Sequence, residues 1–270
     1  MGTGSGRDAI AVIHIEGTIG GATGGLFSGG ADALSVMAKI RQAKDDPEAK
    51  AVVLRINSPG GSAAAAQEIA REIERLKETG KVVVASMGDS AASGGYWIAA
   101  MADRIMANPA TMTGSIGVIM QTANLEELYR NVGIDYYTYK SGPHKDMGAA
   151  NRPPTEEEQE IFQGMIDYIY EQVVTVVAEG RRMSRQQVLE LADGRVFTGA
   201  QALELGLVDE LGNYYDALAL AQELAGLEGE PLVKTYDRRG VPWDSLFNFR
   251  SLLSLLPGGL RGGPDAIEIR

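Results

Sequence analysis

The sequence of 270 residues predicts an α/β protein built on a parallel β-sheet. Short apolar runs rich in valine and isoleucine recur in the first half of the chain, which is typical of buried strands. Segments with helical spacing of apolar residues separate these runs, as right-handed crossovers between parallel strands require. The content of 44% hydrophobic and 23% charged residues is that of a globular chain and excludes a disordered one.

The first half of the chain alternates between predicted strands and predicted helices. Buried strands are expected at residues 9–16, 51–56 and 81–87. Helices are expected at residues 31–44, 63–78 and 93–101, the first with Leu34, Met37 and Ile40 on one stripe. A glycine-rich stretch, residues 17–30, follows the first strand, and a turn of small residues follows the third.

The second half begins with short strands and continues with helices. Strands are expected at residues 104–107, 115–120 and 134–140, with a short helix at residues 124–131. A long amphipathic helix is expected at residues 155–182, because Thr155 and Glu158 have the spacing of a capping box. The remaining helical elements are expected at residues 184–192, with Ser184 as N-cap, and at residues 197–212 and 213–225.

One α/β domain with a helical C-terminal extension accounts for these elements. We expect a flexible lead at residues 1–8, a single domain at residues 9–227 and a tail at residues 228–270. The tail contains an amphipathic segment, residues 244–256, interpreted as a helix docked on the domain or on a neighbouring subunit, with a membrane-contacting helix as the alternative. No stretch has the ~18 apolar residues that a membrane-spanning helix needs.

The composition excludes several kinds of chemistry. The chain has no cysteine, which rules out disulfides, zinc–thiolate sites, iron–sulfur clusters and a cysteine nucleophile. There are only two histidines, and the phosphate-loop and dinucleotide motifs are missing, so we expect neither a metal nor a cofactor. The net charge of −11 argues against nucleic acid as a partner.

The candidate functional residues lie at two strand-to-helix junctions, the edge at which parallel sheets bind ligands. The first junction carries Gly60 and Gly61 in the motif NSPGG, whose backbone N–H groups can face a developing oxyanion, although a tight turn is the simpler interpretation. The second carries Ser93 between Ala92 and Gly94. An accessible hydroxyl beside a backbone N–H is typical of a nucleophile with its own oxyanion donor, whereas a helix N-cap is the usual role of such a serine.

A serine nucleophile needs a general base, and three residues are candidates. His14 lies in the middle of a predicted strand and is interpreted as a core or rim residue. His144 and Lys145 lie together on a loop that follows the strand expected at residues 134–140. A lysine acts as a base near neutral pH only when its pKa falls from about 10.4 toward about 7–8. Spacing alone does not separate the two loop residues.

Four motifs in a fixed order, NSPGG, SAASGGYWIA, TGSIGV and YKSGPHKD, resemble those of the signal peptide peptidase A family of bacterial serine proteases. The later segment RVFTGAQALELGLVDELG resembles the closing segment of that family. The resemblance covers residues 9–227 and fits the short form of the family. It implies a Clp-protease/crotonase-like fold, in which repeated β-β-α units build a parallel sheet with a helical C-terminal extension.

The resemblance also implies a Ser–Lys dyad. Ser93 matches the nucleophile of the family, Lys145 matches the general base, and Ser115 in TGSIGV matches the serine that orients the lysine. The chain departs from the common pattern at residues 148–151, where a Ser-Pro is often found. The departure affects the loop after the lysine and leaves the implied dyad in place.

By the same resemblance, the oxyanion donors would be the N–H of Gly94 and one N–H from Gly60 or Gly61. Neutral Lys145 would take the Ser93 proton as the serine attacks a peptide carbonyl, and water would complete hydrolysis. The implied substrates are signal peptides already released from preproteins, which are apolar and extended and can pair with a sheet edge.

Members of the family form ring- or dome-shaped homo-oligomers, with an octamer expected here, in which the lysine reaches the serine of a neighbouring protomer. An isolated monomer would then be inactive. Family members are anchored in the cell membrane by an N-terminal helix, with the protease domain on the extracytoplasmic side. Because the chain carries no such helix, we expect it to be the soluble portion of an anchored enzyme.

Three other functions are compatible with parts of the pattern. A crotonase-like acyl-CoA enzyme would use the same glycine N–H groups on a thioester and leave Ser93 and Lys145 idle. A Clp-type Ser-His-Asp protease needs a histidine beyond the serine, and residues 118–124 offer none. A non-catalytic oligomeric scaffold at the membrane needs no nucleophile at all.

Overall fold

The computed structural model describes residues 8–20 and 30–236. Within these residues, an eight-stranded sheet has the order β10-β1-β4-β5-β6-β9, with β7 paired to both β5 and β8. Its pairs are parallel except for β7 with β8. A second, two-stranded parallel sheet consists of β2 and β3. The predicted α/β class and its parallel sheet are confirmed.

The described elements have the following bounds. The strands are β1 Ala9–Glu16, β2 Thr18–Gly20, β3 Gly30–Asp32, β4 Ala49–Ser58, β5 Val82–Ala92, β6 Arg104–Ala107, β7 Met112–Gly114, β8 Val196–Thr198, β9 Glu210–Leu211 and β10 Leu232–Thr235. The helices are α1 Ala33–Asp45, α2 Ala63–Lys77, α3 Gly94–Ala100, α4 Glu126–Asn131, α5 Glu156–Arg181, α6 Arg185–Leu191, α7 Gly199–Glu204 and α8 Tyr214–Leu224.

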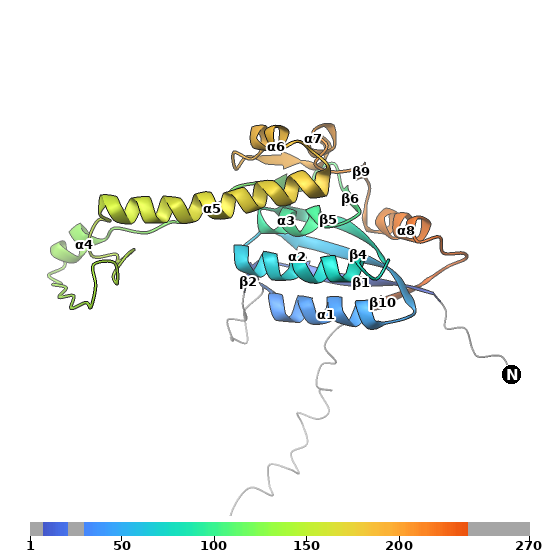
Figure 1. The fold of residues 1–270 in the computed structure, drawn as a ribbon, viewed down its shortest axis with the longest axis horizontal. Helices are drawn as coiled ribbons and strands as arrows, with labels where there is room; N and C mark the ends of the chain where they lie inside the picture. Colours follow the sequence, from blue (N-terminus) through green and yellow to red (C-terminus); the bar gives the residue numbers. More distant parts are fainter. Residues whose placement is uncertain (1–7, 21–29, 237–270) are drawn as a thin grey trace, which may run out of the picture. The chain divides into compact units, whose positions relative to one another are not determined.

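Helices cover both faces of the central strands, so side chains that alternate along each strand enter two cores. Ile13 and Leu54 pack in the larger core, beneath α1, α2 and α3 (Figure 1). Val12 and Val53 point the other way and pack beneath α8. This two-sided burial explains why the strands are nearly continuous apolar runs.

Two strands differ from the prediction at the edge that matters for function. β5 continues through residues 88–92, where a turn was expected, because β7 pairs with its last residues. Gly88 and Ala91 accept side-chain hydrogen bonds from Thr111 and Thr113, which hold the register of this pair. The strand expected at residues 115–120 is wrong: β7 ends at Gly114, since Ser115 has a φ of 48° that a strand does not allow.

Other differences lie outside the central sheet. The strand expected at residues 134–140 is wrong, because the alternating segment is exposed throughout and pairs with no strand in residues 8–20 or 30–236. The helical prediction from residue 197 is wrong at both ends, where β8 and β9 join the sheet. Of the stripe predicted on α1, Met37 and Ile40 are buried as expected, whereas Leu34 is 65% exposed and Val36 is buried in addition.

The two predicted capping signals of the second half are confirmed: Thr155 and Glu158 form the capping box of α5, and Ser184 caps α6. Asn213 caps α8 in the same way, which was not predicted. β10 pairs with β1 beyond the end of the domain expected at residue 227, and the compact unit extends to Tyr236. The helix predicted at residues 244–256 lies outside the described residues.

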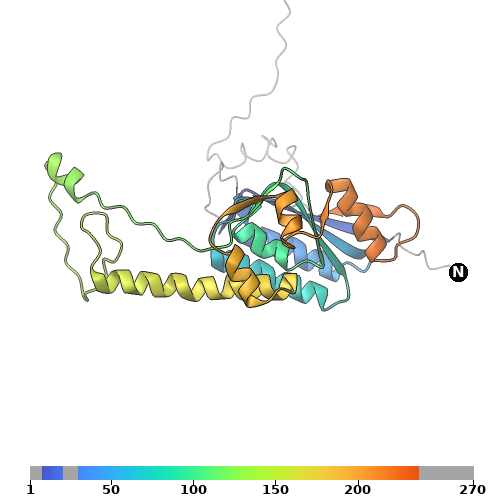
Figure 2. The ribbon, with the colours of Figure 1, turned by 90° about the horizontal axis from the view of Figure 1, so that it is seen from above.

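The two halves of α5 have different surroundings. Val173, Val174 and Val177 are buried in the C-terminal half, which lies beside α3. The N-terminal half of α5 extends away from the sheet (Figure 2). Residues 119–154 extend with it, and we call these residues the arm. Exposed side chains along this stretch include Tyr139 at 93% and Tyr168 at 72%. The same helix therefore connects the core to an exposed segment.

Candidate active site

Ser93 lies at the point where β5 ends and α3 begins. Its backbone has φ 53° and ψ −121°, a conformation that non-glycine residues rarely adopt, and its side chain makes no capping hydrogen bond. The N–H of Ser93 donates to the carbonyl of Gly114, at 2.8 Å, and its carbonyl accepts from Trp97, at 2.9 Å. The backbone is therefore held from both sides, and the hydroxyl is left out of the helix cap.

The helix behind Ser93 is fixed by burial. All seven residues of α3 are buried, whereas Ser93 itself is partly exposed. Tyr96 donates its hydroxyl to the carbonyl of Leu207, at 2.8 Å, and burial raises the pKa of this phenol above its ordinary value. The phenol thus stays protonated and keeps its hydrogen bond, which anchors the helix to a distant part of the chain.

Glycines of the first junction lie directly against Ser93. A Cβ on Gly60 would lie 2.7 Å from the Cβ of Ser93 and 2.9 Å from the nitrogen of Gly94. A Cβ on Gly94 would lie 3.4 Å from the nitrogen of Gly61. Gly60 also has a φ of 103°, which favours glycine. The prediction that the two junctions meet is confirmed by these approaches.

The two candidate N–H groups of the first junction differ in their hydrogen bonding. The N–H of Gly60 donates to the hydroxyl of Ser58, at 3.1 Å, and Ser58 is fully buried. Within the described residues, the N–H of Gly61 has no acceptor. The N–H of Gly94 is the first of α3 and has no intrahelical acceptor. Gly61 and Gly94 therefore present N–H groups that a ligand oxygen can accept.

Ser115 lies next to this junction through strand pairing. Ala92 of β5 is paired with Gly114 of β7. Ser93 and Ser115 are the next residues of the two strands, so they leave the sheet side by side. Ser115 has a φ of 48°, and its N–H donates to the carbonyl of Arg195, at 2.8 Å. Two residues that support the site, Arg195 and Ser58, were not singled out from the sequence, although Ser58 lies in NSPGG and Arg195 begins the segment RVFTGAQALELGLVDELG.

Lys145 is not part of this cluster within the chain. It lies on the turn between α4 and α5, is exposed, and forms no hydrogen bond or ion pair with Ser93 or Ser115. The segment between these helices lies at the end of α5 that is away from α3 (Figures 1 and 2). The structure thus brings together the serines and the glycines and leaves the lysine apart.

The two histidines occupy different environments. His144 Nε2 lies 3.5 Å from a carboxylate oxygen of Glu157 at the start of α5. His14 Nδ1 lies 3.3 Å from Glu16 on the same strand, and its side chain is 41% exposed. His14 is thus a rim residue of the sheet, as interpreted from the sequence.

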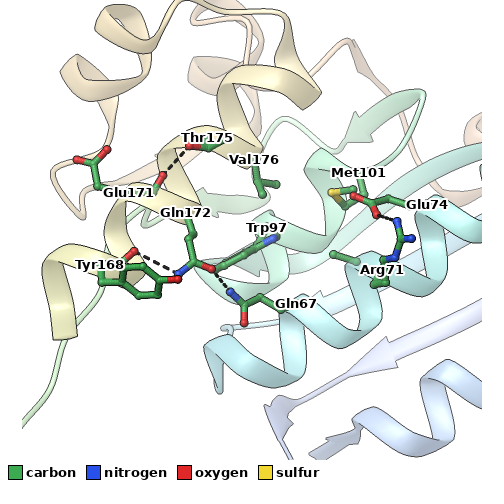
Figure 3. Close-up of a pocket in the computed structure, with 11 residues that line it drawn as sticks. Gln67, Arg71, Glu74, Trp97, Met101, Tyr168, Glu171, Gln172, Thr175 and Val176 are labelled. Carbon is green, nitrogen blue, oxygen red and sulfur yellow. Dashed lines mark hydrogen bonds and ion pairs between the residues drawn. The ribbon is translucent and has the colours of Figure 1, made fainter.

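A cavity of about 430 Å³ lies apart from the serine, between α2, α3 and α5 (Figure 3). Trp97, Met101 and Val176 form its apolar floor, and Gln67 donates to Gln172 across its mouth. Neither Ser93 nor Lys145 lines it. The cavity therefore does not belong to the serine cluster.

The serine at the end of a parallel strand, with free backbone N–H groups around it, defines a hydrolase that acts through a serine nucleophile. Residues 75–228 match the peptidase family S49, and this segment includes Ser93, Ser115 and Lys145. The chain belongs to peptidase family S49 and is a serine peptidase. The predicted family is therefore confirmed.

Relatives of the chain agree with this assignment. It is 44% identical to a putative protease of Synechocystis, over 88% of this chain and 81% of the relative. It is 42% identical to a putative signal peptide peptidase SppA of Enterococcus faecium, over 67% of this chain and 53% of the relative. It is 35% identical to protease 4 of Haemophilus influenzae, over 96% of this chain and 41% of the relative. The chain thus spans only about half of the two latter relatives.

Proposed function

We propose that the chain is a Ser–Lys endopeptidase in which Ser93 is the nucleophile and Lys145 is the general base. The observation that carries the proposal is the conformation of Ser93: a strained backbone, a hydroxyl that caps nothing, and glycine backbones packed against it. Strain of this kind costs about 1–3 kcal/mol and persists where the surrounding structure enforces it, as at functional sites.

The oxyanion would be held by the N–H groups of Gly61 and Gly94. Gly60, the alternative from the sequence, already donates to the buried hydroxyl of Ser58. The role of Gly60 is then to let the two backbones approach, since any side chain there would meet Ser93.

The chemistry is acyl transfer to Ser93. Neutral Lys145 accepts the proton of the Ser93 hydroxyl as the oxygen attacks the peptide carbonyl, and Ser115 orients the lysine. The N–H donors hold the tetrahedral oxyanion until the C–N bond breaks and the lysine protonates the leaving amine. Water, deprotonated by the same lysine, then hydrolyses the acyl-serine and frees the nucleophile.

Lys145 would act on the Ser93 of a neighbouring copy in a ring- or dome-shaped homo-oligomer. The arm supports this arrangement, because residues 131–140 are exposed throughout and include Ile134, Tyr137 and Tyr139. An apolar and aromatic stretch of this kind is typical of an interface.

Released signal peptides are the proposed substrates, and the membrane surface is the proposed place of action. The name of the relative from Enterococcus faecium, a putative signal peptide peptidase SppA, supports the substrate. No helix among the described residues is long and apolar enough to cross a membrane.

Phosphonylation of the nucleophile by a fluorophosphonate probe, in which the serine oxygen displaces fluoride from phosphorus, tests the proposed residues when the modified site is located by peptide mapping. The probe should modify Ser93 in the wild-type chain and nothing in Ser93→Ala. Lys145→Ala should abolish turnover of a peptide substrate, whereas His144→Ala should keep most of it. A Lys145→Ala protein with near-normal turnover would refute the dyad, and turnover of an acyl-CoA thioester by Ser93→Ala would favour the crotonase-like alternative.

A further inference from the structure

We propose that Arg152 is a positioning residue for Lys145: its guanidinium connects the lysine turn to the capped first turn of α5. The inference rests on the proposed function, because it assigns Arg152 a role only through the lysine base.

The guanidinium of Arg152 binds the side chain of Asp146, the residue that follows Lys145 in the chain. Nε and Nη2 of Arg152 donate to the two carboxylate oxygens of Asp146, at 3.0 and 2.8 Å. This is the two-pronged geometry that only arginine offers, and it fixes direction as well as distance. The side chain of Asp146 is only 13% exposed, so the contact lies inside the turn rather than on its surface.

The same guanidinium also holds the start of α5. Nη1 of Arg152 donates to Oε2 of Glu158, at 2.8 Å, and Nη2 donates to Oε1. Glu158 is 1% exposed and accepts the N–H of Thr155, at 2.9 Å, as part of the capping box. Glu158 is thus bound to the helix, and Arg152 transmits that rigid position to Asp146.

Lys140 closes the turn from its other end. Its ammonium donates to Oδ1 of Asp146, at 2.7 Å, and to the carbonyl of Pro143, at 2.9 Å. Residues 140–146 are therefore tied at the beginning and at the end of the turn. Of the two lysines in this segment, Lys140 is engaged in the network, whereas Lys145 is exposed and forms no ion pair among the described residues.

The network keeps its charges over the pH range of a lysine base. The hydrogen bonds of Arg152 hold the pKa of Asp146 well below its ordinary value and lower that of Glu158 to about 2. Two cations, Lys140 and Arg152, balance these two carboxylates. Besides Lys145, the charged or titratable side chains of residues 140–158 are Lys140, His144, Asp146, Arg152, Glu156, Glu157 and Glu158.

Removal of Arg152 would therefore have two separable effects. The turn would lose its tie to α5, which lowers the rate at which the lysine meets the serine. Asp146, which follows the lysine in the chain, and Glu158 would also lose their shared cation, and uncompensated negative charge in this segment favours a protonated amine. The first effect lowers kcat, and the second moves the rising limb of the pH–rate profile to higher pH.

Steady-state kinetics of the full chain on a peptide substrate test this role. Arg152→Gln should lower kcat about tenfold or more, with KM within about twofold, and raise the midpoint of the rising limb by about half a pH unit. Arg152→Lys should leave the rising limb of the pH–rate profile at its wild-type pH, because the positive charge is kept. It should recover only part of kcat, because the two-pronged hydrogen bonds of the guanidinium are lost. In the double variant Arg152→Gln/Glu158→Gln, the rising limb of the pH–rate profile should return to its wild-type pH, because one negative charge is removed with the positive one. The kcat should stay low, because the tie to α5 is still missing.

The matched control is Arg185→Gln. Arg185 pairs with Glu171 on the exposed surface of the helices, with side chains 57% and 53% exposed, and its substitution should leave kcat and the limb unchanged. A folded Arg152→Gln protein that has the wild-type kcat and the wild-type midpoint of the rising limb in its pH–rate profile would overturn the proposal. If that variant fails to fold or assemble, Asp146→Asn decides: a kcat within about twofold of wild type would overturn the proposal equally.

The outcomes separate this proposal from the proposed function. Near-normal turnover by Lys145→Ala would refute Lys145 as the general base, and with it the proposed function, whatever the kinetics of Arg152 variants. Loss of turnover in Lys145→Ala together with normal kinetics in Arg152→Gln keeps the dyad and rejects only the positioning role.

Discussion

The Ser93 junction and the arm that carries Lys145 are built in opposite ways. Ser93 follows a strand of 11 residues with paired neighbours on both sides and begins a helix that is buried at every residue. The arm is exposed along most of its length, and charged pairs between residues 140 and 158 hold its turn. The difference teaches that the packed core sets the geometry of the serine, whereas charged contacts within the arm and with the start of α5 hold the turn that carries the lysine.

Substitutions in the two regions should therefore change activity and stability in different ways. A substitution at the serine junction must displace packed backbone, which cannot relax without moving strands. A substitution in the arm changes contacts within the arm and leaves the strands of the sheet in place. Apart from loss of Lys145 itself, the largest effects are therefore expected at the junction and smaller ones in the arm.

Gly60→Ala should remove nearly all activity. Its Cβ would meet the Cβ of Ser93 at 2.7 Å, so the nucleophile must shift, and we expect kcat/KM to fall about 100-fold or more. Gly80→Ala is the matched control: Gly80 also has a positive φ, of 82°, but a Cβ there meets nothing within 4 Å. It should lose stability and keep kcat/KM. Equal kinetic losses in both variants would show that φ strain, not contact with Ser93, is responsible.

A mixture of two inactive variants should regain activity if the arm serves a neighbouring copy. Subunits of Ser93→Ala and Lys145→Ala mixed in equal amounts should reach about a quarter of the wild-type rate, because both intact residues then meet at one site in four. Recovery is measured by peptide turnover after subunit exchange has been confirmed by mass spectrometry. Confirmed exchange without recovery would place both residues of a working site in one chain.

The two halves of α5 should respond in opposite directions to the same substitution. A Cβ on Gly180 would lie 2.0 Å from the carbonyl oxygen of Ala100, so Gly180→Ala should destabilise the fold by about 1–3 kcal/mol. A Cβ on Gly164 meets nothing within 4 Å, so Gly164→Ala should stabilise the helix by about 0.5–1 kcal/mol. Urea unfolding measures both, and destabilisation by Gly164→Ala would mean that the free half of the helix is packed in solution.

Acid should loosen the start of α5 through Glu158. Its pKa falls from an ordinary value of 4.5 to about 2, chiefly through Arg152, so the carboxylate stabilises the fold above pH 4.5. That contribution is lost as the pH falls from about 4.5 to about 2. Melting temperatures across this range should drop less steeply in Glu158→Gln than in the wild-type chain. Identical slopes would show that this carboxylate is not coupled to folding.

Local patterns predicted much of the serine half of the site. Apolar strand runs, the small residues after them and the motifs around Gly60 and Ser93 were enough to predict both junctions at one edge of the sheet. The choice between Gly60 and Gly61 could not be made in this way, since it depends on the hydroxyl of Ser58, whose hydrogen bond forms only when the loop is folded.

The arm was harder to predict. The alternation in residues 134–140 is that of a strand, but a strand also needs a neighbour, and none of the described residues supplies one. The role of Arg152 was invisible in the sequence for a similar reason, because its partners, Asp146 and Glu158, are brought together by the path of the turn and not by a local spacing rule.

The sequence by itself determined the α/β class, the order of the larger strands and helices from β1 to α3 without the short strands β2 and β3, the caps of α5 and α6, and the residues that resemble a Ser–Lys dyad. These features depend on periodicity, turn chemistry and motif order, which act over a few residues. Only the tertiary structure decided that β7 continues the edge of β5 and sets Ser115 beside Ser93, and that the lysine stays apart from both. Register and burial arise from contacts between distant segments, and no local pattern specifies those contacts.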